Sequence, residues 1–241
     1  STTNNSAAGG ASSRTFSHTV TTQTNQALIV TVETTGTNAP TSVTFNGIAL
    51  TMAGSAVGTN TVVSAWYLAS PTVTTANIVI TMPSSVVIYA HASNVYNVDQ
   101  TTPISNVQTN VGTTVGPVLN VTSTSAGDLL FDAYAHATNA GITAGGGQTG
   151  LFDEVPTASL RSRGSTKPGT AGNVTMTENG GATNHAYIGF NVKASSALGI
   201  AVTTATANFS SNCTVSAGSC YDSSSVVNIL QSFTGASGSA L

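Results

Sequence analysis

The stretch Ser42-Val-Thr-Phe-Asn-Gly-Ile-Ala-Leu-Thr51 carries the clearest structural signal in this chain. Two short runs of aliphatic, aromatic and β-branched residues flank Asn46-Gly47. An Asn-Gly pair between such runs is the strongest short-range signal for a tight β-hairpin. The stretch therefore predicts two antiparallel strands, Ser42–Asn46 and Ile48–Met52.

The same texture continues on both sides of this hairpin, in runs separated by Gly, Pro, Asn and Ser. No window has a helical period, and evenly spaced short strands are typical of sandwiches and jelly rolls. We therefore predict an all-β protein, an antiparallel, jelly-roll-like β-sandwich. Its further expected strands are Thr15–Val20, Ala27–Thr35, Thr61–Leu68, Ala76–Met82, Val86–Tyr96, Ser105–Val111, Val118–Thr122, Asp128–Thr138, Gln148–Val155, Ser159–Arg163, Asn173–Thr177 and Asn184–Lys193.

The pattern divides the chain into three parts. Residues 1–13 are polar and small, without periodicity, and are expected to form an N-terminal tail. Residues 14–194 form the predicted sandwich domain. Residues 195–241 are expected to add a C-terminal β extension, consisting of a hairpin and a final strand, which is too small to be stable alone. The chain begins with Ser1, as expected for a processed mature form.

Cys213 and Cys220 are the only cysteines, and they flank Thr214–Ser219 in the predicted hairpin. A turn at Ala217-Gly218 would bring the two sulfurs within bonding range. A disulfide there implies an oxidising, extracellular compartment. A pair of buried thiols or half of a metal site is the alternative.

Composition excludes several classes of function. Charged residues make up 5% of the chain and the net charge is -3, whereas about 25% is ordinary for a soluble domain. Five basic residues are too few for a nucleic-acid partner, and no apolar run is long enough to span a membrane. A surface of Thr, Ser, Asn and Gly has little charge repulsion, so it favours self-association.

Four motifs resemble a recurrent β-sandwich domain of secreted bacterial and phage surface proteins, over about residues 14–194. They are Ser42–Thr51, Ala65-Trp-Tyr-Leu-Ala-Ser-Pro71, Val98-Asp-Gln-Thr-Thr-Pro103 and Gly127-Asp-Leu-Leu-Phe-Asp132. The resemblance implies an adhesive or architectural module, in some cases near carbohydrate-binding ones. The Thr-rich, weakly charged texture is also similar, in style alone, to microbial filament subunits held together by strand donation.

Catalytic signatures are absent from the sequence: it has no Gly-x-Ser-x-Gly elbow and no phosphate-binding Gly-rich loop before a helix. Its eight acidic residues cannot be paired from sequence, so we expect no catalytic residue, no cofactor and no enzyme. A secreted hydrolase would need a carboxylate pair or a Ser/His contact.

Histidines provide the candidate metal ligands. His91, His136 and His185 all fall on expected strands, and Asp132 lies two pleats from His136. These three histidines are weak candidates for a metal site, and hydrogen-bonded sheet histidines are the alternative. Because Tyr89-Ala-His-Ala-Ser-Asn94 is echoed by Tyr134-Ala-His-Ala-Thr-Asn139, we expect two neighbouring, equivalent strands of one sheet.

Other residues bear on glycans. Trp66 alternates with Val62, Ser64 and Leu68 and is expected in the core. Tyr67, Tyr89, Tyr96 and Tyr134 remain as candidates for a sugar platform. Asn-x-Ser/Thr triplets, which permit glycosylation, begin at Asn4, Asn120, Asn173, Asn208 and Asn212.

The expected function is that of a structural subunit of an extracellular filament or cell-surface assembly of identical chains, joined by β-strand exchange. Residues Val226–Phe233 are the first candidate for the exchanged strand, because an apolar face there needs a partner sheet. Residues 1–20 are the second. The alternative is a monomeric carbohydrate-binding or adhesin module with surface glycans as partners. The assembly residues of the first candidate are Val226, Val227, Ile229, Leu230 and Phe233.

Overall fold

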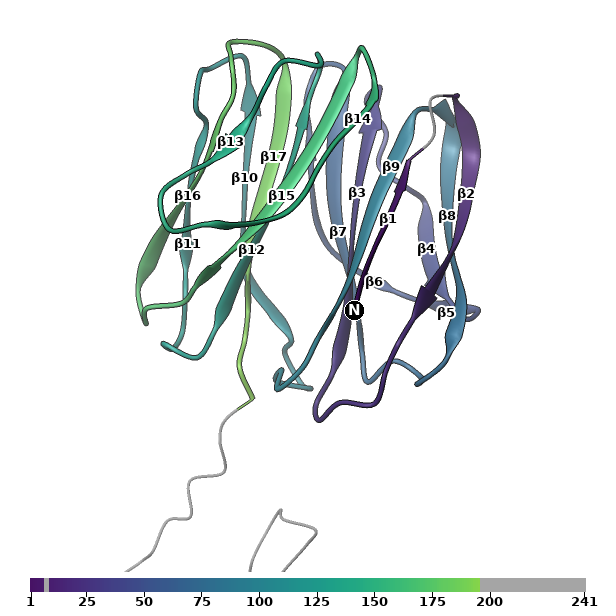
Figure 1. Ribbon diagram of the computed structural model, residues 1–241, viewed down its shortest axis with the longest axis vertical. Helices are drawn as coiled ribbons and strands as arrows, with labels where there is room; N and C mark the ends of the chain where they lie inside the picture. The colour runs from purple at the N-terminus through teal and green to yellow at the C-terminus, as the bar shows by residue number, and fades with distance from the viewer. Residues whose placement is uncertain (7–8, 196–241) are drawn as a thin grey trace, which may run out of the picture. The chain divides into compact units, whose positions relative to one another are not determined.

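The computed structural model describes residues 1–6 and 9–195 of the chain. All regular structure in this part is β, arranged as antiparallel sheets that pack face to face (Figure 1). The predicted antiparallel sandwich is confirmed. The chain forms it twice, however, as two sandwiches stacked on one another.

The first sandwich consists of an inner and an outer sheet. Its inner sheet contains, in spatial order, β1 (Thr2–Ser6), β9 (Ile88–Val95), β3 (Ala27–Thr35), β7 (Thr61–Ala69) and β6 (Thr51–Val57). Its outer sheet contains β2 (Ala11–Thr19), β8 (Thr75–Val86), β4 (Ser42–Phe45) and β5 (Ile48–Ala49).

The second sandwich repeats this plan. Its inner sheet contains β10 (Ile104–Gly112), β17 (His185–Val192), β12 (Leu129–His136), β15 (Leu160–Pro168) and β14 (Thr149–Thr157). Its outer sheet contains β11 (Val118–Thr122), β16 (Asn173–Asn179) and β13 (Thr143–Ala144).

Apolar side chains fill three spaces between successive sheets. The central core lies between the two inner sheets and contains small residues on both sides, such as Ala65 and Ala133, around Phe131 and Phe190. The core of the first sandwich surrounds Phe45 and Trp66, which confirms Trp66 as a core residue. The core of the second sandwich includes two tyrosines and is the smallest of the three.

The two sandwiches are structural repeats. The order β1-β9-β3-β7-β6 corresponds strand for strand to β10-β17-β12-β15-β14, and β2-β8-β4 corresponds to β11-β16-β13. Strands β6 and β10 contact each other at one side of the central core, and β1 and β14 contact each other at the other side. The inner sheets are therefore related by an approximate two-fold axis.

Register extends this correspondence to single residues. The central strands β3 and β12 align with Ala27 matching Leu129, because each begins a run that pairs with both neighbouring strands. In the outer sheets, Asn77-Ile-Val-Ile80 of β8 corresponds to Asn173-Val-Thr-Met176 of β16, and the second and fourth residues of both segments are buried. Residues at matched positions of the two sandwiches can therefore be compared directly.

Two expectations from the sequence are corrected by the structure. The segment 1–13, expected to be a tail, contains β1 and the beginning of β2. The similar segments around His91 and His136 are not neighbouring strands of one sheet, because β9 and β12 belong to the two different inner sheets. The strand that corresponds to β9 is β17. The described part of the chain has no helix long and apolar enough to cross a membrane.

Gly164 leaves room for the Phe152 ring, which lies in the central core, and provides a test of this packing. A Cβ at this position would overlap the Phe152 ring and lie 2.9 Å from the backbone oxygen of Asp132. We expect Gly164→Ala to lower the free energy of unfolding by about 1–3 kcal/mol, since overpacking forces side chains and backbone to shift. Gly146→Ala is the matched control, because a Cβ there meets no atom within 4 Å. Equal urea midpoints for the two variants would contradict this packing.

Candidate functional site

The N-terminal strand β1 occupies one edge of the first inner sheet. It pairs antiparallel with β9 alone, with Thr3 opposite Ala92 and Asn4 opposite His91. Successive side chains of a strand point to opposite faces. One face of β1 therefore meets the first outer sheet, and the other points toward the second sandwich.

Buried histidines hold β1 from both faces. Thr3 Oγ1 lies 2.9 Å from His18 Nδ1 on β2, and Asn4 Oδ1 lies 2.5 Å from His91 Nδ1 on β9. The His91 ring also stacks on Phe152 of β14, with ring centroids 4.6 Å apart. A short polar strand is thus attached to its own sandwich and, through His91, to the other one.

More contacts continue along the same strand. Arg14 Nε donates a hydrogen bond of 2.5 Å to Asn5 Oδ1, and Ser1 Oγ donates one of 2.5 Å to the Thr19 carbonyl. Because residues 1, 3 and 5 all contact β2, the side chains of β1 follow the expected alternation. Side chains, as well as backbone pairing, therefore specify this strand position.

The histidines at this strand are held neutral. Nδ1 of His91 donates to Asn4 Oδ1, so its Nε2 accepts from Ser93 Oγ at 2.6 Å. Burial lowers the pKa of His91 to about 4, and His18 adds to this effect. Burial also lowers the pKa of His18.

The three predicted metal ligands do not converge. His91 lies in the first inner sheet, whereas His136 and His185 are register partners in the second. His136 Nε2 faces the Gly181 carbonyl and His185 Nδ1 faces the Thr183 carbonyl. Within residues 1–6 and 9–195, no group of three or more His, Cys, Asp or Glu side chains could hold a metal ion.

A buried polar cluster lies between the sheets of the second sandwich. Asp132 of β12 accepts hydrogen bonds from Tyr187 Oη (2.7 Å) and Ser165 Oγ (2.7 Å). Glu178 of β16 lies in ion-pair contact with Arg163 of β15, with Oε2 and Nε 2.7 Å apart. Both carboxyl groups are fully buried.

Alternating charges connect this cluster to the surface. Arg161 makes a two-point contact with Asp153, with both nitrogen–oxygen distances at 2.8 Å. Asp153 also contacts Arg163 Nη1 at 3.3 Å, and Arg163 reaches inward to Glu178. Arg163 therefore contacts Asp153 near the surface and Glu178 in the core.

Burial raises the pKa of both carboxyl groups. For Asp132, the hydrogen bonds from Tyr187 and Ser165 oppose this rise without cancelling it. For Glu178, the nearby Asp132 carboxylate raises the pKa further, and Arg163 opposes the rise. Two buried acids that share one low-dielectric space do not both ionise easily.

The first sandwich shows that its fold does not require this cluster. At the matched positions it has Val30 where the second has Asp132, and Met82 where the second has Glu178. Trp66 occupies the place of Ser165 and lies in an apolar core. Buried polar groups that the same scaffold replaces by hydrocarbon are candidates for function.

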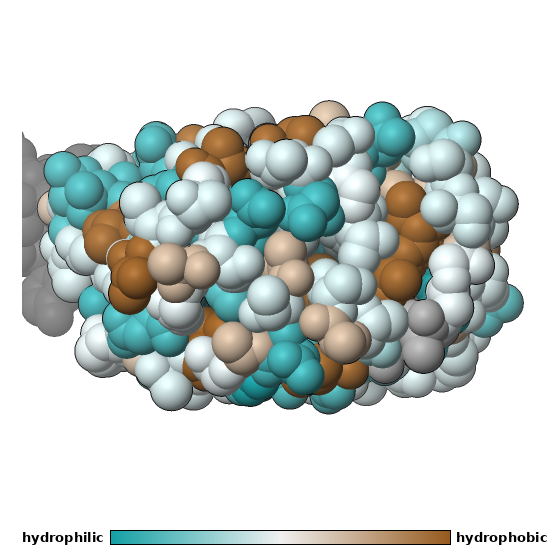
Figure 2. Space-filling view, turned by 90° about the horizontal axis from the view of Figure 1, so that it is seen from above, coloured by the Kyte–Doolittle hydropathy of each residue, from teal (hydrophilic) through white to brown (hydrophobic). Residues whose placement is uncertain are grey.

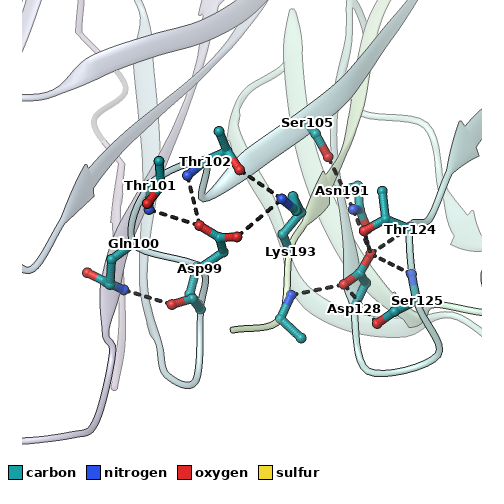
Figure 3. A network of polar contacts seen from close by, with 12 residues as sticks. Asp99, Gln100, Thr101, Thr102, Ser105, Thr124, Ser125, Asp128, Asn191 and Lys193 are labelled. Atoms are coloured by element: carbon teal, nitrogen blue, oxygen red, sulfur yellow. Dashed lines mark hydrogen bonds and ion pairs between the residues drawn. The ribbon is translucent and has the colours of Figure 1, made fainter. Parts of the chain in front are cut away.

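A second polar network fixes the end of the described chain (Figure 3). Asp128 Oδ2 accepts from Thr124 N (2.7 Å) and Asn191 Nδ2 (2.8 Å), and its Oδ1 accepts from Ala194 N (2.9 Å). Burial by itself raises the pKa of Asp128. The hydrogen bonds from Thr124, Ala194 and Asn191 outweigh burial and lower it.

Asp99 completes this network on the linker between the two sandwiches. Its Oδ1 accepts from the backbone nitrogens of Thr101 and Thr102, and its Oδ2 contacts Lys193 Nζ at 3.2 Å (Figure 3). Ser195 N also donates to the Asn97 carbonyl at 2.7 Å. We call these contacts of Asp99 and Asp128 the exit clamp.

Several predicted residues have other outcomes. Cys213, Cys220, Asn208, Asn212 and the strand Val226–Phe233 lie outside the described residues. Tyr89 and Tyr134 are buried and offer no platform for a sugar, whereas Tyr96 is 61% exposed. Asn4, Asn120 and Asn173 are exposed, and their glycosylation stays a prediction.

Comparisons with protein-family models, curated proteins and solved structures found no match. The chain is an all-β protein with several antiparallel sheets, and no family is identified. The contacts described above therefore carry the functional argument.

Sequence reasoning missed the parts of both clusters that depend on register. Thr3 and Asn4 lie in a polar segment without periodicity. Their contacts with His18 and His91 become visible only when this segment is seen paired with β9. Ser165, Gln148 and Glu178 lie in three separate segments, and no sequence spacing brings them together.

Protonation of His91 provides a test of the β1 site. The pKa of His91 is about 4 in the folded protein, below its ordinary value. Between these two pKa values the unfolded chain binds more protons than the folded protein. The free energy of unfolding therefore falls as the pH drops through this window. We expect the wild type to lose about 2 kcal/mol more of its unfolding free energy than His91→Gln between about pH 7 and pH 5. Urea titrations at both pH values measure the difference. Equal losses would contradict the buried, neutral ring.

Glu178 provides the opposite test. Its raised folded pKa contributes stability that is present below the ordinary carboxyl pKa and is lost as pH rises through the folded value. Glu178→Gln has no such proton to lose. We therefore expect the difference in melting temperature, variant minus wild type, to increase from acid to mildly alkaline pH. Parallel melting curves across this range would show that Glu178 is not held protonated by its surroundings.

Proposed function

We propose that this chain is a structural subunit of an extracellular assembly whose copies are joined by exchange of a β-strand. The observation that carries the proposal is the β1 site. Here a short strand at a sheet edge is specified by backbone pairing on one side and by His18 and His91 on its two faces. The other candidate, Val226–Phe233, is left for experiment.

The connection of β1 to the rest of the chain favours exchange. Gly9 and Gly10 immediately precede β2, and glycine places little restriction on the backbone. The same strand from a second copy would satisfy the same donors and acceptors, as in strand addition and domain swapping. Exchange in one direction leaves a free site on each new copy, so the assembly continues as a filament.

Surface chemistry also supports association. Only 5% of all residues are charged. The face seen in Figure 2 is mostly of intermediate hydropathy, with scattered hydrophilic and hydrophobic patches. Such a surface repels other copies weakly. The predicted extracellular location and the lack of enzymatic activity are part of the same proposal.

The alternative, a carbohydrate-binding or adhesin module, has one observation in its favour. A shallow, open hollow of about 490 Å³ on the first outer sheet is lined by hydroxyl and amide side chains, including Ser17, Thr44 and Asn77. Hydroxyl and amide groups suit sugar recognition, but no aromatic side chain lines this hollow. Glycan binding by a chain that stays monomeric would favour the module.

Paired cysteines at the β1 site test strand exchange. Thr2 and Ser93 are opposite residues of β1 and β9, and opposite Cα atoms of antiparallel strands lie about 4.5–5.5 Å apart, within the range for a disulfide. We expect the oxidised double variant Thr2→Cys/Ser93→Cys to give a ladder of linked chains on a denaturing gel. Each single variant controls for Cys213 and Cys220. If electron micrographs show assembled material but the disulfide forms only within single chains, a strand other than β1 joins the copies.

A further inference from the structure

The polar cluster of the second sandwich brings a hydroxyl group, a carboxylate and a carboxamide into direct contact. Ser165 Oγ donates to Asp132 Oδ1 at 2.7 Å. Gln148 Nε2 donates to Ser165 Oγ at 2.7 Å and to Asp132 Oδ2 at 3.0 Å. Asp132 and Ser165 are fully buried. These groups could carry out an acyl transfer within the protein, with the Ser165 hydroxyl as nucleophile and the Gln148 carboxamide as acyl donor.

The Gln148 carboxamide is held next to this hydroxyl, and attack on its carbonyl carbon requires the plane of the amide to turn toward Ser165 Oγ. Its Oε1 accepts a hydrogen bond of 2.8 Å from the backbone N–H of Thr177, so donors and acceptors around the amide agree on its orientation. Because Nε2 is bonded to Cδ at about 1.33 Å, the Ser165 hydroxyl lies within about 4 Å of the carbonyl carbon.

We propose that Ser165 and Gln148 form an intramolecular ester. The Ser165 Oγ–Gln148 Cδ bond forms and the Cδ–Nε2 bond breaks. The hydroxyl proton passes to the Asp132 carboxylate and from there to the leaving nitrogen, which departs as ammonia. No oxidant, reductant or other reactant is needed. The chain loses one ammonia molecule.

Each neighbour of the reacting atoms contributes a defined effect. Asp132 contacts both the hydroxyl that loses a proton and the nitrogen that gains one, so a single carboxylate serves as base and then as acid. The Thr177 N–H stabilises the negative charge that develops on Oε1. Because the reacting groups are already held in contact, little entropy is lost when they react, and burial of Asp132 and Ser165 limits the access of water to the ester.

The surroundings of Asp132 suit this role. A carboxylate whose pKa is raised toward neutrality is a stronger base than an ordinary one, and burial raises the pKa of Asp132. The matched positions in the first sandwich hold Val30 and Trp66 in place of Asp132 and Ser165. The strand framework common to both sandwiches therefore does not require Asp132 and Ser165.

An ester at this place would fasten an edge of the second inner sheet. Gln148 immediately precedes the edge strand β14, and Ser165 lies on its neighbour β15. The bond would hold the beginning of β14 against β15 when backbone hydrogen bonds open. This inference does not depend on strand exchange, because the ester lies within one chain.

The intact mass of the purified full chain tests the proposal. We expect the wild type to weigh one ammonia less than its sequence predicts, and Ser165→Ala and Gln148→Glu to show no such loss. Gln148→Glu keeps the shape of the side chain, so it tests the chemistry even if Ser165→Ala folds poorly. Asp132→Asn is expected to lose ammonia slowly or not at all.

Peptide mapping locates the bond. Trypsin cleavage after Arg161 and Arg163 places Gln148 and Ser165 in separate peptides. We expect these peptides to remain joined in the wild type and to separate in both variants. An unmodified wild-type mass would overturn the proposal. So would an ammonia loss that persists in Ser165→Ala or maps to Asn46-Gly47 or Asn179-Gly180, where succinimide formation releases the same molecule.

Discussion

Face-to-face packing of the two inner sheets is the constraint on which the rest of the structure depends. Their central strands have no solvent-facing side, and all eight residues of β17 and the first eight of β3 are buried. Small residues at the shared face, such as Ala65 and Ala133, allow the sheets to approach closely. Each outer sheet then covers the remaining face of an inner sheet, and the edge strands β1 and β14 come to lie side by side.

The strands were predictable because their signal is local, whereas the doubled sandwich was not. The expected strand Ala27–Thr35 coincides with β3, and alternation, β-branched residues and turn residues are enough to locate such an element. The repeat is hidden because matched positions differ in chemistry. A run such as Ala27-Leu-Ile-Val-Thr-Val32, apolar on both faces, is the one sequence signal that two sheets cover this strand. The β1 site and the polar cluster depend on register between distant segments, which a single sequence does not specify.

The two halves place their polar residues on opposite faces of the same scaffold. The second sandwich has Asp132 and Glu178 in its own core, where the first has Val30 and Met82. The first has Glu33 on β3 in the central core, at the position that Ala135 fills on β12. Burial raises the pKa of Glu33 well above its ordinary value, and Tyr89 is its register partner on β9. The two halves thus share a strand order but differ in the side chains at these matched positions.

The exit clamp has a mechanical consequence for any tension applied to the chain at Ser195. Asp128 connects Ala194 to the second sandwich, and Asp99 connects Lys193 to the linker from the first. Strand β17, which ends just before the clamp, is paired on both sides by β10 and β12. A pull along β17 must therefore shear two hydrogen-bond ladders at once, after breaking the clamp, and cannot open either ladder one bond at a time.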